Sequence, residues 1–253
     1  MDQVAIKRLA YSPNTTYQEH AHTETQITLF MSGGVEEQVG DQWRTIGALD
    51  FVIKPAGLPH KDQFLERGAQ TIQVSVDPEK ANEWGITRRL STYQAKFCPL
   101  LARHFLSLFW GIRNSSQHHA SESPLAGLMR NIAAMSSAGP KSTSVQPKWL
   151  SPIIRRINRD FQQNISVQEL ARQHEKHPVS LARTFRAHFG QSIKQRVCQL
   201  RVQLAANQLC ESDRSAAAIA HNCGFSDQSH MNRVFKSVTG IPPVQYRRFV
   251  REK

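Results

Sequence analysis

The sequence contains no long hydrophobic run, and this absence excludes one class of protein. A membrane-spanning helix needs about 18 consecutive apolar residues, and the 253-residue sequence contains no such run. The start, with Met1 and Asp2, also lacks the basic flank and apolar run of a secretory signal. We therefore expect a soluble, cytoplasmic protein with no membrane partner.

Cysteine is scarce, which excludes two further kinds of scaffold. The four cysteines are scattered and form no CxxC pair that could seat structural zinc, and they are too few for a dense disulfide framework. Isolated cysteines of this kind usually behave as small apolar side chains. We expect four reduced, mostly buried thiols at Cys98, Cys198, Cys210 and Cys223.

Acidic residues are also scarce in the second half of the chain. Residues 148–253 contain 18 Lys and Arg against 7 Asp and Glu, a net charge of +11, whereas residues 1–147 contain 14 against 13, a net charge of +1. No acidic cluster in the basic half could hold catalytic magnesium, which argues against a nuclease. A basic domain attracts nucleic acid, because each neutralised phosphate releases counterions. On charge alone, a merely soluble basic surface and a membrane-surface patch remain alternatives.

The first part of the chain has the hydrophobic pattern of short strands. Apolar or alternating segments occupy residues 26–31, 51–53 and 71–76, and strands of this length and spacing suggest an all-β barrel or sandwich. The sequence predicts turns between these strands at Gly33-Gly34, at Gly40-Asp41 and at residues 55–57.

Residues 97–135 change to a helical period. Their apolar residues recur at three- and four-residue steps, which indicates two amphipathic helices. These helices either pack against the barrel of the same chain or form a homodimer interface. The polar, small-residue segment at 136–148 predicts a linker. The apolar positions are Phe97, Leu100, Leu101, Phe105, Leu108, Phe109, Leu125, Leu128, Met129 and Ile132.

The basic half contains an internal repeat. Residues 181–190 and 231–240 share the order apolar, x, Arg, x, Phe, basic, three residues and Gly, at an offset of 50 positions. Leu170-Ala171 precedes the first copy as Ile219-Ala220 precedes the second. A repeat of this length is one supersecondary unit used twice.

Each copy carries the start and stop residues of two short helices joined by a tight turn. In the first copy, Ser166 and Glu169 form a capping box, and Pro178 opens the next helix. The sequence predicts this unit at about 166–189, after an opening helix near residues 153–161.

The second copy has the same organisation at about 215–239. Ser215 caps its first helix, Gly224 ends that helix, and Ser226 or Asp227 caps the second. A connecting helix over residues 193–204 joins the two copies. Two helices with such a short turn form the unit that inserts its second helix into the major groove of DNA.

Several ordered segments give residues 149–253 a specific resemblance. They are Leu170-Ala171, 177–186, Gly190, Ile219-Ala220, 224–230, 233–236 and 240–248. This combination resembles the DNA-binding domain of the AraC/XylS family of transcription regulators. One departure is the turn at 175–177, where the family usually has smaller residues.

The resemblance implies two recognition helices in successive major-groove segments of double-stranded DNA, with RNA polymerase as a further partner. Arg can pair with guanine, Gln and Asn with adenine, while Val and Ala offer only apolar contact to a thymine methyl. Arg186 and Lys236 are expected on phosphates, and for Arg183 and Arg233 base and phosphate contacts both remain open. By their spacing, Leu181, Phe185, Met231, Val234 and Phe235 belong to the core. The positions that match the family's base-contacting residues are Val179, Ser180, Ala182, Arg183, Gln228, Ser229, Asn232 and Arg233.

A second resemblance lies in the strand region. His20-Ala21-His22, then Gln26, then Pro55, Gly57 and His60 are similar to the cupin motifs, in which His-x-His and a carboxylate are followed by Pro-x-Gly-x-x-His. In cupins these side chains converge inside the barrel, where three imidazoles and an oxygen ligand suit a transition metal. Here Gln stands in place of the usual Glu.

Three interpretations of this second motif remain open. His20, His22 and His60 hold a divalent transition metal, or these residues and Gln26 line a metal-free effector pocket, or the histidines only hydrogen-bond within the barrel. No cofactor is required by any motif in the sequence.

The sequence therefore predicts a two-domain α+β protein. A cupin-like all-β barrel at 1–96 senses an unknown small-molecule effector, helices follow at 97–135 and a linker at 136–148, and 149–253 forms an all-α DNA-binding domain with two helix-turn-helix units. The predicted function is sequence-specific regulation of transcription, with no catalytic residues. The alternative is a metal-dependent cupin enzyme that carries a DNA-binding tail.

Overall fold

The computed structural model describes residues 4–114, 124–134 and 146–251, so most of the predicted linker lies outside the described residues. Two compact units divide the chain. The first comprises Met1–Met135, Ala206–Asp213 and Phe235–Lys253, and the second comprises Ser136–Ala205 and Arg214–Val234. In the described ranges, every helix is too short or too polar to cross a bilayer.

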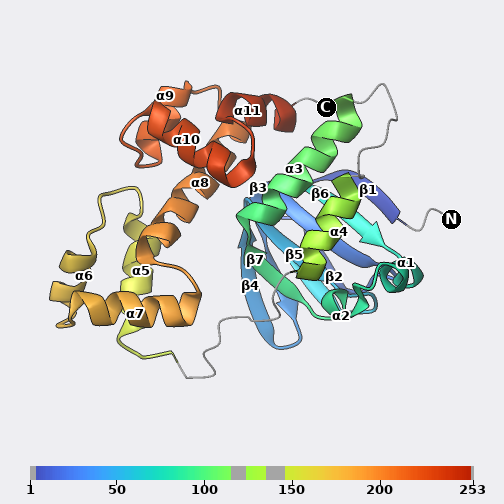
Figure 1. The fold of residues 1–253 in the computed structure, drawn as a ribbon, viewed down its shortest axis with the longest axis horizontal. Helices are drawn as coiled ribbons and strands as arrows, with labels where there is room; N and C mark the ends of the chain where they lie inside the picture. Colours follow the sequence, from blue (N-terminus) through green and yellow to red (C-terminus); the bar gives the residue numbers. More distant parts are fainter. Residues whose placement is uncertain (1–3, 115–123, 135–145, 252–253) are drawn as a thin grey trace. The chain divides into compact units, whose positions relative to one another are not determined.

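The first unit is built on one antiparallel seven-stranded sheet, as the strand pattern predicted (Figure 1). Its central path runs β1-β6-β3-β5-β7, while β2 pairs with β6 and β4 pairs with β3. The two long strands, β3 and β6, therefore contact most of the others and carry most of the barrel interior. The strands are β1 Val4–Tyr11, β2 Thr16–His20, β3 Thr25–Val39, β4 Gln42–Gly47, β5 Asp50–Lys54, β6 His60–Val76 and β7 Gln94–Phe97.

The predicted turn at Gly33-Gly34 is wrong, because these glycines lie inside β3 at a break in its register with β6. Gly33 has φ of +72°, and a Cβ on it would lie 1.9 Å from the carbonyl oxygen of Gly68. Glycine is therefore needed for a bulge, in which the chain bends without leaving the sheet. The predicted turns at Gly40 and Gly57 are confirmed.

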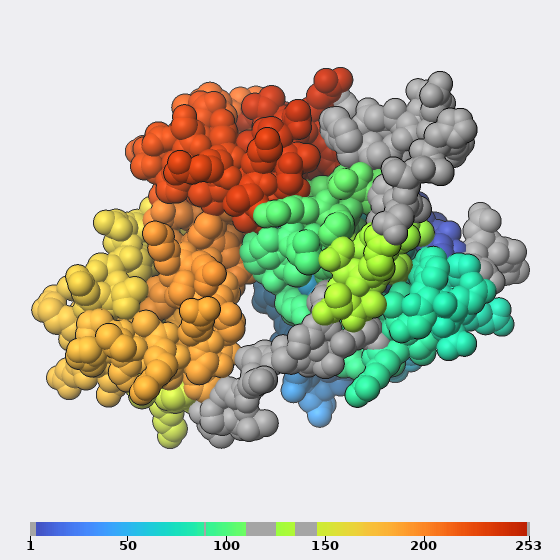
Figure 2. Space-filling model, in the orientation of Figure 1, coloured from blue at the N-terminus to red at the C-terminus, as the bar shows by residue number. Residues whose placement is uncertain are grey.

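Two longer helices follow the strands and confirm the predicted change of period. They are α3 Pro99–Asn114 and α4 Pro124–Ala134, and they lie side by side in Figures 1 and 2. Phe105 and Leu128 are fully buried, Leu100 on α3 is 47% exposed, and the helical assignment of Phe97 is wrong because this residue ends β7. Two short helices that the sequence analysis missed are α1 Pro78–Glu83 and α2 Thr87–Leu90.

The basic half is entirely helical in its described residues, and both predicted helix-turn-helix units are present. The first is formed by α6 and α7, the second by α9 and α10, and α8 connects them. The helices are α5 Leu150–Asp160, α6 Val167–Gln173, α7 Pro178–Phe189, α8 Ile193–Glu211, α9 Ala216–Asn222, α10 Gln228–Thr239 and α11 Pro243–Arg251. The predicted combination of an all-β amino-terminal barrel and an all-α carboxy-terminal part is thus confirmed.

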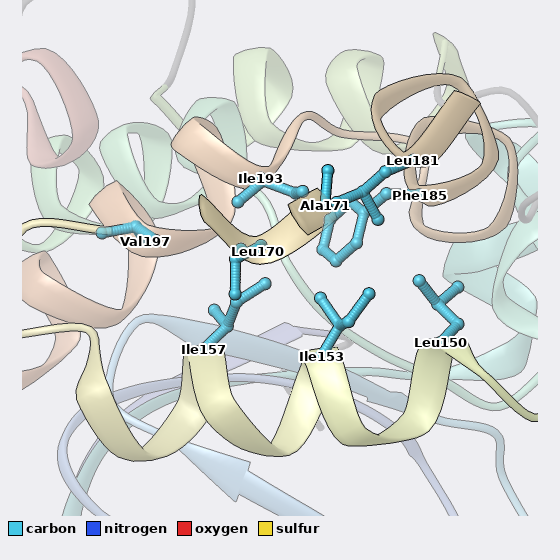
Figure 3. Packing of buried hydrophobic residues seen from close by; sticks show 9 residues of the cluster. All are labelled: Leu150, Ile153, Ile157, Leu170, Ala171, Leu181, Phe185, Ile193 and Val197. Carbon is cyan, nitrogen blue, oxygen red and sulfur yellow. The ribbon is translucent and has the colours of Figure 1, made fainter. Parts of the chain in front are cut away.

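One apolar cluster holds the first helix-turn-helix unit together, and Figure 3 shows its side chains directed toward one another. Burying each large aliphatic or aromatic side chain contributes about 1.5–3 kcal/mol. Leu181 and Phe185, predicted to be core residues of α7, belong to this cluster, as do residues of α5, α6 and α8. Its members are Leu150, Ile153, Ile157, Leu170, Ala171, Leu181, Phe185, Ile193 and Val197.

Candidate nucleic-acid interface and barrel pocket

The first helix-turn-helix unit begins with the predicted cap. The Ser166 hydroxyl accepts a hydrogen bond from the N–H of Glu169 at 3.4 Å, which satisfies one of the free donors at the start of α6. The Glu169 carboxylate pairs with Arg172, at 2.8 Å, in place of the reciprocal bond of a full capping box. Pro178 occupies the first turn of α7, where its missing N–H costs nothing.

The turns of the two units follow the same backbone path. Glu175 has φ of +53° and Gly224 has φ of +83°. In both turns the next residue donates its N–H to the carbonyl five positions earlier, at 2.9 and 3.0 Å. Glu175 thus occupies a left-handed position that glycine takes in the second unit. This is the turn at which the sequence departs from the AraC/XylS pattern.

The predicted contact residues of α7 lie on its outer face. Val179 is 67% exposed, and Arg183 and Arg186 are exposed, while Leu181 and Phe185 between them are buried. Ala182 is exposed and Ser180 is half-buried. The helix therefore separates a core side from a side on which one apolar and two cationic groups are free to meet a ligand.

Asp227 caps the second recognition helix. Its carboxylate accepts hydrogen bonds from the N–H of His230 at 2.7 Å and from the Ser226 hydroxyl at 3.0 Å. The bond from the His230 N–H is the largest cause of a lowered pKa at Asp227, and the bond from the Ser226 hydroxyl is the next. Of the two caps that the sequence allowed, Asp227 is the one that bonds the backbone of α10.

The predicted contact residues of α10 are more polar than those of α7. Gln228, Ser229, Arg233 and Lys236 are exposed. Asn232 is half-buried, and its Oδ1 is buried with no hydrogen-bond partner among the described residues. On the core side Met231 and Phe235 are fully buried as predicted, and Val234 is half-buried.

A cavity of about 330 Å³ lies inside the barrel. Its walls come from strands β1, β2, β3, β5 and β6 and from the loop after β2. Volumes of this size hold small ligands, and a wall that is mainly apolar with a few converging polar groups is typical of ligand sites. The lining residues are Leu9, Tyr11, Tyr17, His20, His22, Gln26, Thr28, Phe30, Val35, Lys54, Asp62, Phe64, Thr71 and Gln73.

The fold brings the three predicted histidines together, and two of them, His20 and His22, line the cavity. The nitrogen atoms that could bind a ligand in His20, His22 and His60 all lie within 4.8 Å of one another. The sheet positions two of them, because His20 on β2 is paired with His60 on β6. The loop around Gly57 positions the third, since its N–H bonds the carbonyl of His22 at 2.7 Å.

Hydrogen bonds also set the tautomer of two of these rings. Nδ1 of His20 lies 2.8 Å from the carbonyl oxygen of Gln18, and Nδ1 of His60 lies 2.9 Å from that of Leu58. A carbonyl can only accept, so each Nδ1 carries the proton and each Nε2 keeps its lone pair. Nε2 of His60 is buried and has no hydrogen-bond partner among the described residues.

Burial disfavours the charged form of two of these imidazoles. It lowers the pKa of His60 to about 4, with the positive charge of Lys54 as the next cause, and it lowers the pKa of His22. Three imidazoles so close together fit a divalent transition metal, because such metals bind the lone pair of a ring nitrogen whose other nitrogen is held by a carbonyl. Gln26 also lines this cavity, as predicted.

A buried charged cluster lies beside the histidines, and sequence reasoning missed it. Nζ of Lys54 lies 2.5 Å from Oε1 of Glu37 and 3.1 Å from Oδ2 of Asp62. Oδ2 of Asp62 lies 3.8 Å from Nε2 of His60. Burial raises the pKa of Glu37, and Lys54 opposes this rise. A pattern that could have revealed Glu37 is its position on the inward-facing side of β3, two residues after Val35.

The cavity also has an aromatic part. The rings of Tyr11 and Phe64 are stacked, with centroids 4.0 Å apart and planes 11° apart, and Tyr17 meets both edge-on. Thr71, a fully buried lining residue, has a hydroxyl with no hydrogen-bond partner among the described residues. An unsatisfied buried hydroxyl costs free energy unless a ligand or water bonds it.

Two known family models match this chain, one over the strand-rich part and α3 and α4, the other over most of the helical part. A family model described as an AraC-like ligand binding domain matches residues 6–142, and one described as a helix-turn-helix domain matches residues 170–248. The first covers more than half of the chain. This chain belongs to the AraC family.

Curated AraC-family relatives are regulators by name. The chain is 35% identical over 200 residues to a putative AraC-like transcription regulator of Streptomyces lividans, covering 76% of this chain and 60% of the relative. It is 29% identical over 140 residues to the transcriptional activator RhaR of Mannheimia succiniciproducens, covering 55% and 50%. The chain thus spans about half to three fifths of the length of these relatives.

A solved structure resembles the helical part of this AraC-family chain. It is the C-terminal domain of AraT, a response regulator from Geobacillus stearothermophilus, at 25% identity. The match covers 42% of this chain and 88% of that one, with a TM-score of 0.40.

Proposed function

We propose that this AraC-family chain is a transcription regulator that reads specific duplex DNA with α7 and α10 and responds to a small molecule bound in the barrel. One observation carries the proposal: a single chain holds two helix-turn-helix units whose second helices expose basic and amide side chains above buried cores. The net charge of +11 on residues 148–253 supports it, because it favours a polyanion as the partner.

The two recognition helices contact different bases. On α7, Val179 and Ala182 contact thymine methyl groups, Ser180 either base type, and Arg183 guanine or phosphate. On α10, Gln228 and Asn232 pair with adenine, Ser229 assists, and Arg233 contacts guanine or phosphate. Arg186 and Lys236 contact phosphates, which fix the register of the protein without reading sequence.

The barrel cavity is the proposed effector site. The rings of Tyr11 and Phe64 favour a ligand with a flat or apolar body, and the histidines, Gln26 and Thr71 favour a polar group at one end. A ligand of this kind would also satisfy the free Thr71 hydroxyl.

A divalent transition metal on His20, His22 and His60 is part of this proposal. The support is the convergence of three ring nitrogens within 4.8 Å. When bound, such a metal would supply a positive charge for an anionic effector group. Gln26 is a neutral oxygen donor where cupins have a carboxylate, so an effector oxygen is a better further ligand than the protein itself.

The remaining parts of the proposal concern partners and setting. We infer a role without catalysis in the cytoplasm, contact with RNA polymerase at promoters, and homodimerisation through α3 or α4. The names of the relatives support regulation. The amphipathic character of α3 and α4 is compatible with dimerisation, although Phe105 and Leu128 are buried within one chain.

The test is selection of duplex DNA from a random library by the purified full chain, followed by affinity measurements at one fixed salt concentration. The proposal expects a selected site that binds about 10³-fold or more tightly than random duplex. Equal affinity for selected and random DNA would leave only charge-driven binding and overturn it. Metal analysis of the same sample tests the histidine site, and turnover of a substrate by the metal-loaded chain without specific DNA binding would instead support the metal-dependent enzyme.

A further inference from the structure

We propose that occupation of the barrel cavity is transmitted to the second recognition helix through α11, by way of strands β1 and β3. This inference rests on the proposed function and specifies how that effector site acts. The barrel, α11, the last residues of α8 and the end of α10 all belong to the first compact unit. The contacts among them are therefore contacts within one unit.

One row of side chains forms the start of this route. Thr71 on β6 is the register partner of Leu9 on β1 and of Phe30 on β3, and all three line the cavity. A ligand that displaces this row moves three adjacent strands at once, because a sheet in register transmits displacements across its hydrogen bonds. Neighbouring residues on β1 and β3 point to the opposite face, since side chains alternate along a strand.

The backbone of β3 beside this row makes two hydrogen bonds to the helices. The Tyr246 hydroxyl on α11 donates to the carbonyl of Met31, the residue after Phe30. The N–H of Gly33 donates to Oδ1 of Asn207 on α8 at 2.9 Å. The bulge at Gly33 leaves this N–H available, so the irregularity in β3 has a defined partner.

On β1 the contact is charged. Arg8, next to Leu9, donates from its guanidinium to the carbonyls of Phe249 and Val250 near the end of α11. The last carbonyls of a helix have no partner within it and carry partial negative charge, so a cation there stabilises the end. The same guanidinium donates to Oε1 of Gln70 at 2.8 Å, which fixes its orientation on the sheet.

Tyr246 connects this interface to the recognition helix. Its side chain is fully buried, and its ring meets that of Phe235 edge-on, with centroids 5.1 Å apart. Phe235 lies on α10, three residues after Asn232 and next to Lys236. One side chain therefore contacts the cavity-bearing strand through its hydroxyl and the DNA-reading helix through its ring.

A ligand shifts such a system only if it binds one arrangement of the strands and α11 better than another. Tyr246→Phe removes the hydroxyl bond to Met31 and keeps the ring against Phe235. Thr71→Leu adds volume inside the cavity at the centre of the row, where the native hydroxyl has no partner to lose. Together these two substitutions test the route without an identified effector.

The experiment measures the affinity of four full-length proteins for the selected duplex: the wild type, Thr71→Leu, Tyr246→Phe and the double variant. Thr71→Leu is expected to change the dissociation constant at least about fivefold in the wild-type background, the lower end of typical allosteric coupling. In the Tyr246→Phe background the change should fall below about twofold. Gln245→Ala, on the exposed side of α11, is the matched control and should leave the effect of Thr71→Leu intact.

Hydrogen exchange of the α11 amides, measured without DNA, separates this inference from the proposed function. The route is supported if Thr71→Leu changes the exchange rates of the α11 amides in the wild-type background but not in the Tyr246→Phe background. This holds even if the chain does not bind specific DNA. An equal response in both backgrounds, or none in either, overturns the route while specific DNA binding stands. If Thr71→Leu lowers the melting temperature to the point of unfolding, Phe30→Leu replaces it in the same scheme.

Discussion

His20 and His60 occupy paired positions on β2 and β6, with ring centroids 4.3 Å apart. Each ring uses Nδ1 to bond the backbone carbonyl two residues earlier in its own strand or loop. This shared arrangement leaves Nε2 of each ring outside these backbone bonds. It is the local geometry expected of ring nitrogens that bind a metal or a donor group of a ligand.

Replacing His60 by Ala should therefore weaken binding of Zn²⁺ or Ni²⁺ to the full chain by about 100-fold or more, since even losing an outer hydrogen-bond partner of a metal ligand costs 10–100-fold. The measurement is calorimetric titration with the metal alone. His221→Ala, an exposed histidine of α9, is the control and should change nothing.

The same variant distinguishes the three interpretations of the histidines. Loss of metal binding with the DNA affinity intact supports the metal site. Loss of effector response without any metal binding in the wild type supports a metal-free pocket. A lower melting temperature as the sole effect, or unchanged regulation, would make these histidines purely structural.

Gln228→Ala should relax base preference in the DNA segment that faces α10. If the Gln228 contact is bidentate, the substitution should weaken the binding free energy for the selected site by about 1–3 kcal/mol. Asn232→Ala should do the same, because an amide at this position of the second recognition helix can pair with adenine. Lys236→Ala should instead weaken all sequences alike and reduce the salt slope by about one. Competition assays on selected and random duplexes check this, and identical losses for Gln228→Ala and Lys236→Ala would refute the assignment.

Glu175→Gly should raise the free energy of unfolding by about 0.5–1 kcal/mol. A left-handed conformation costs an ordinary residue about 1–2 kcal/mol, and glycine avoids this cost. Glycine also loses more backbone entropy on folding, which offsets part of the stabilisation. Gly224→Ala, at the matching position, should be destabilising by about 1–3 kcal/mol, because its Cβ would lie 2.1 Å from the carbonyl oxygen of Gln162. Urea unfolding measures both, and a destabilised Glu175→Gly would contradict the left-handed turn.

Thiol reactivity tests the packing around two cysteines, of which Cys223 is buried as predicted, whereas Cys210, like Cys98 and Cys198, is only half-buried. Burial raises the pKa of Cys210 and of Cys223 to about 12 each. The thiolate is the reactive form, so at pH 8 only about one molecule in 10⁴ is reactive at either position. Both should react with a thiol reagent far more slowly in the native chain than after denaturation, which mass spectrometry of labelled peptides resolves. Equal rates before and after denaturation would contradict their burial.

The sequence predicted most of the helical half because local rules coincide there. Ser166, Ser215 and Asp227 cap helices where their side chains suggested, and the two Arg-x-Phe patterns fall on α7 and α10. Charge, repeat and caps all follow from positions close in sequence. Glu175 was the exception, since a left-handed residue other than glycine leaves no compositional mark.

The barrel was less predictable, because its determinants are distant in sequence. Gly33 suggested a turn, but the close approach of Gly68 makes it a bulge. The ion pair joins Lys54 on β5 to Glu37 on β3, and although the position of Glu37 after Val35 suggests an inward side chain, nothing near it in sequence identifies Lys54 as its partner. The resemblance to the cupin motifs did predict a convergent trio, since the His-x-His pattern and the turn before His60 that carry it are local features.

The most direct measurement of the central claim is a hydroxyl-radical footprint of the full chain on its selected duplex, with the number of chains per site determined in parallel. Two helix-turn-helix units in one chain predict that one chain protects two major-groove segments about one helical turn, ~34 Å, apart. Arg183→Ala should then alter protection of one segment and Gln228→Ala that of the other. Protection of a single segment, or two segments that require two chains, would contradict the account.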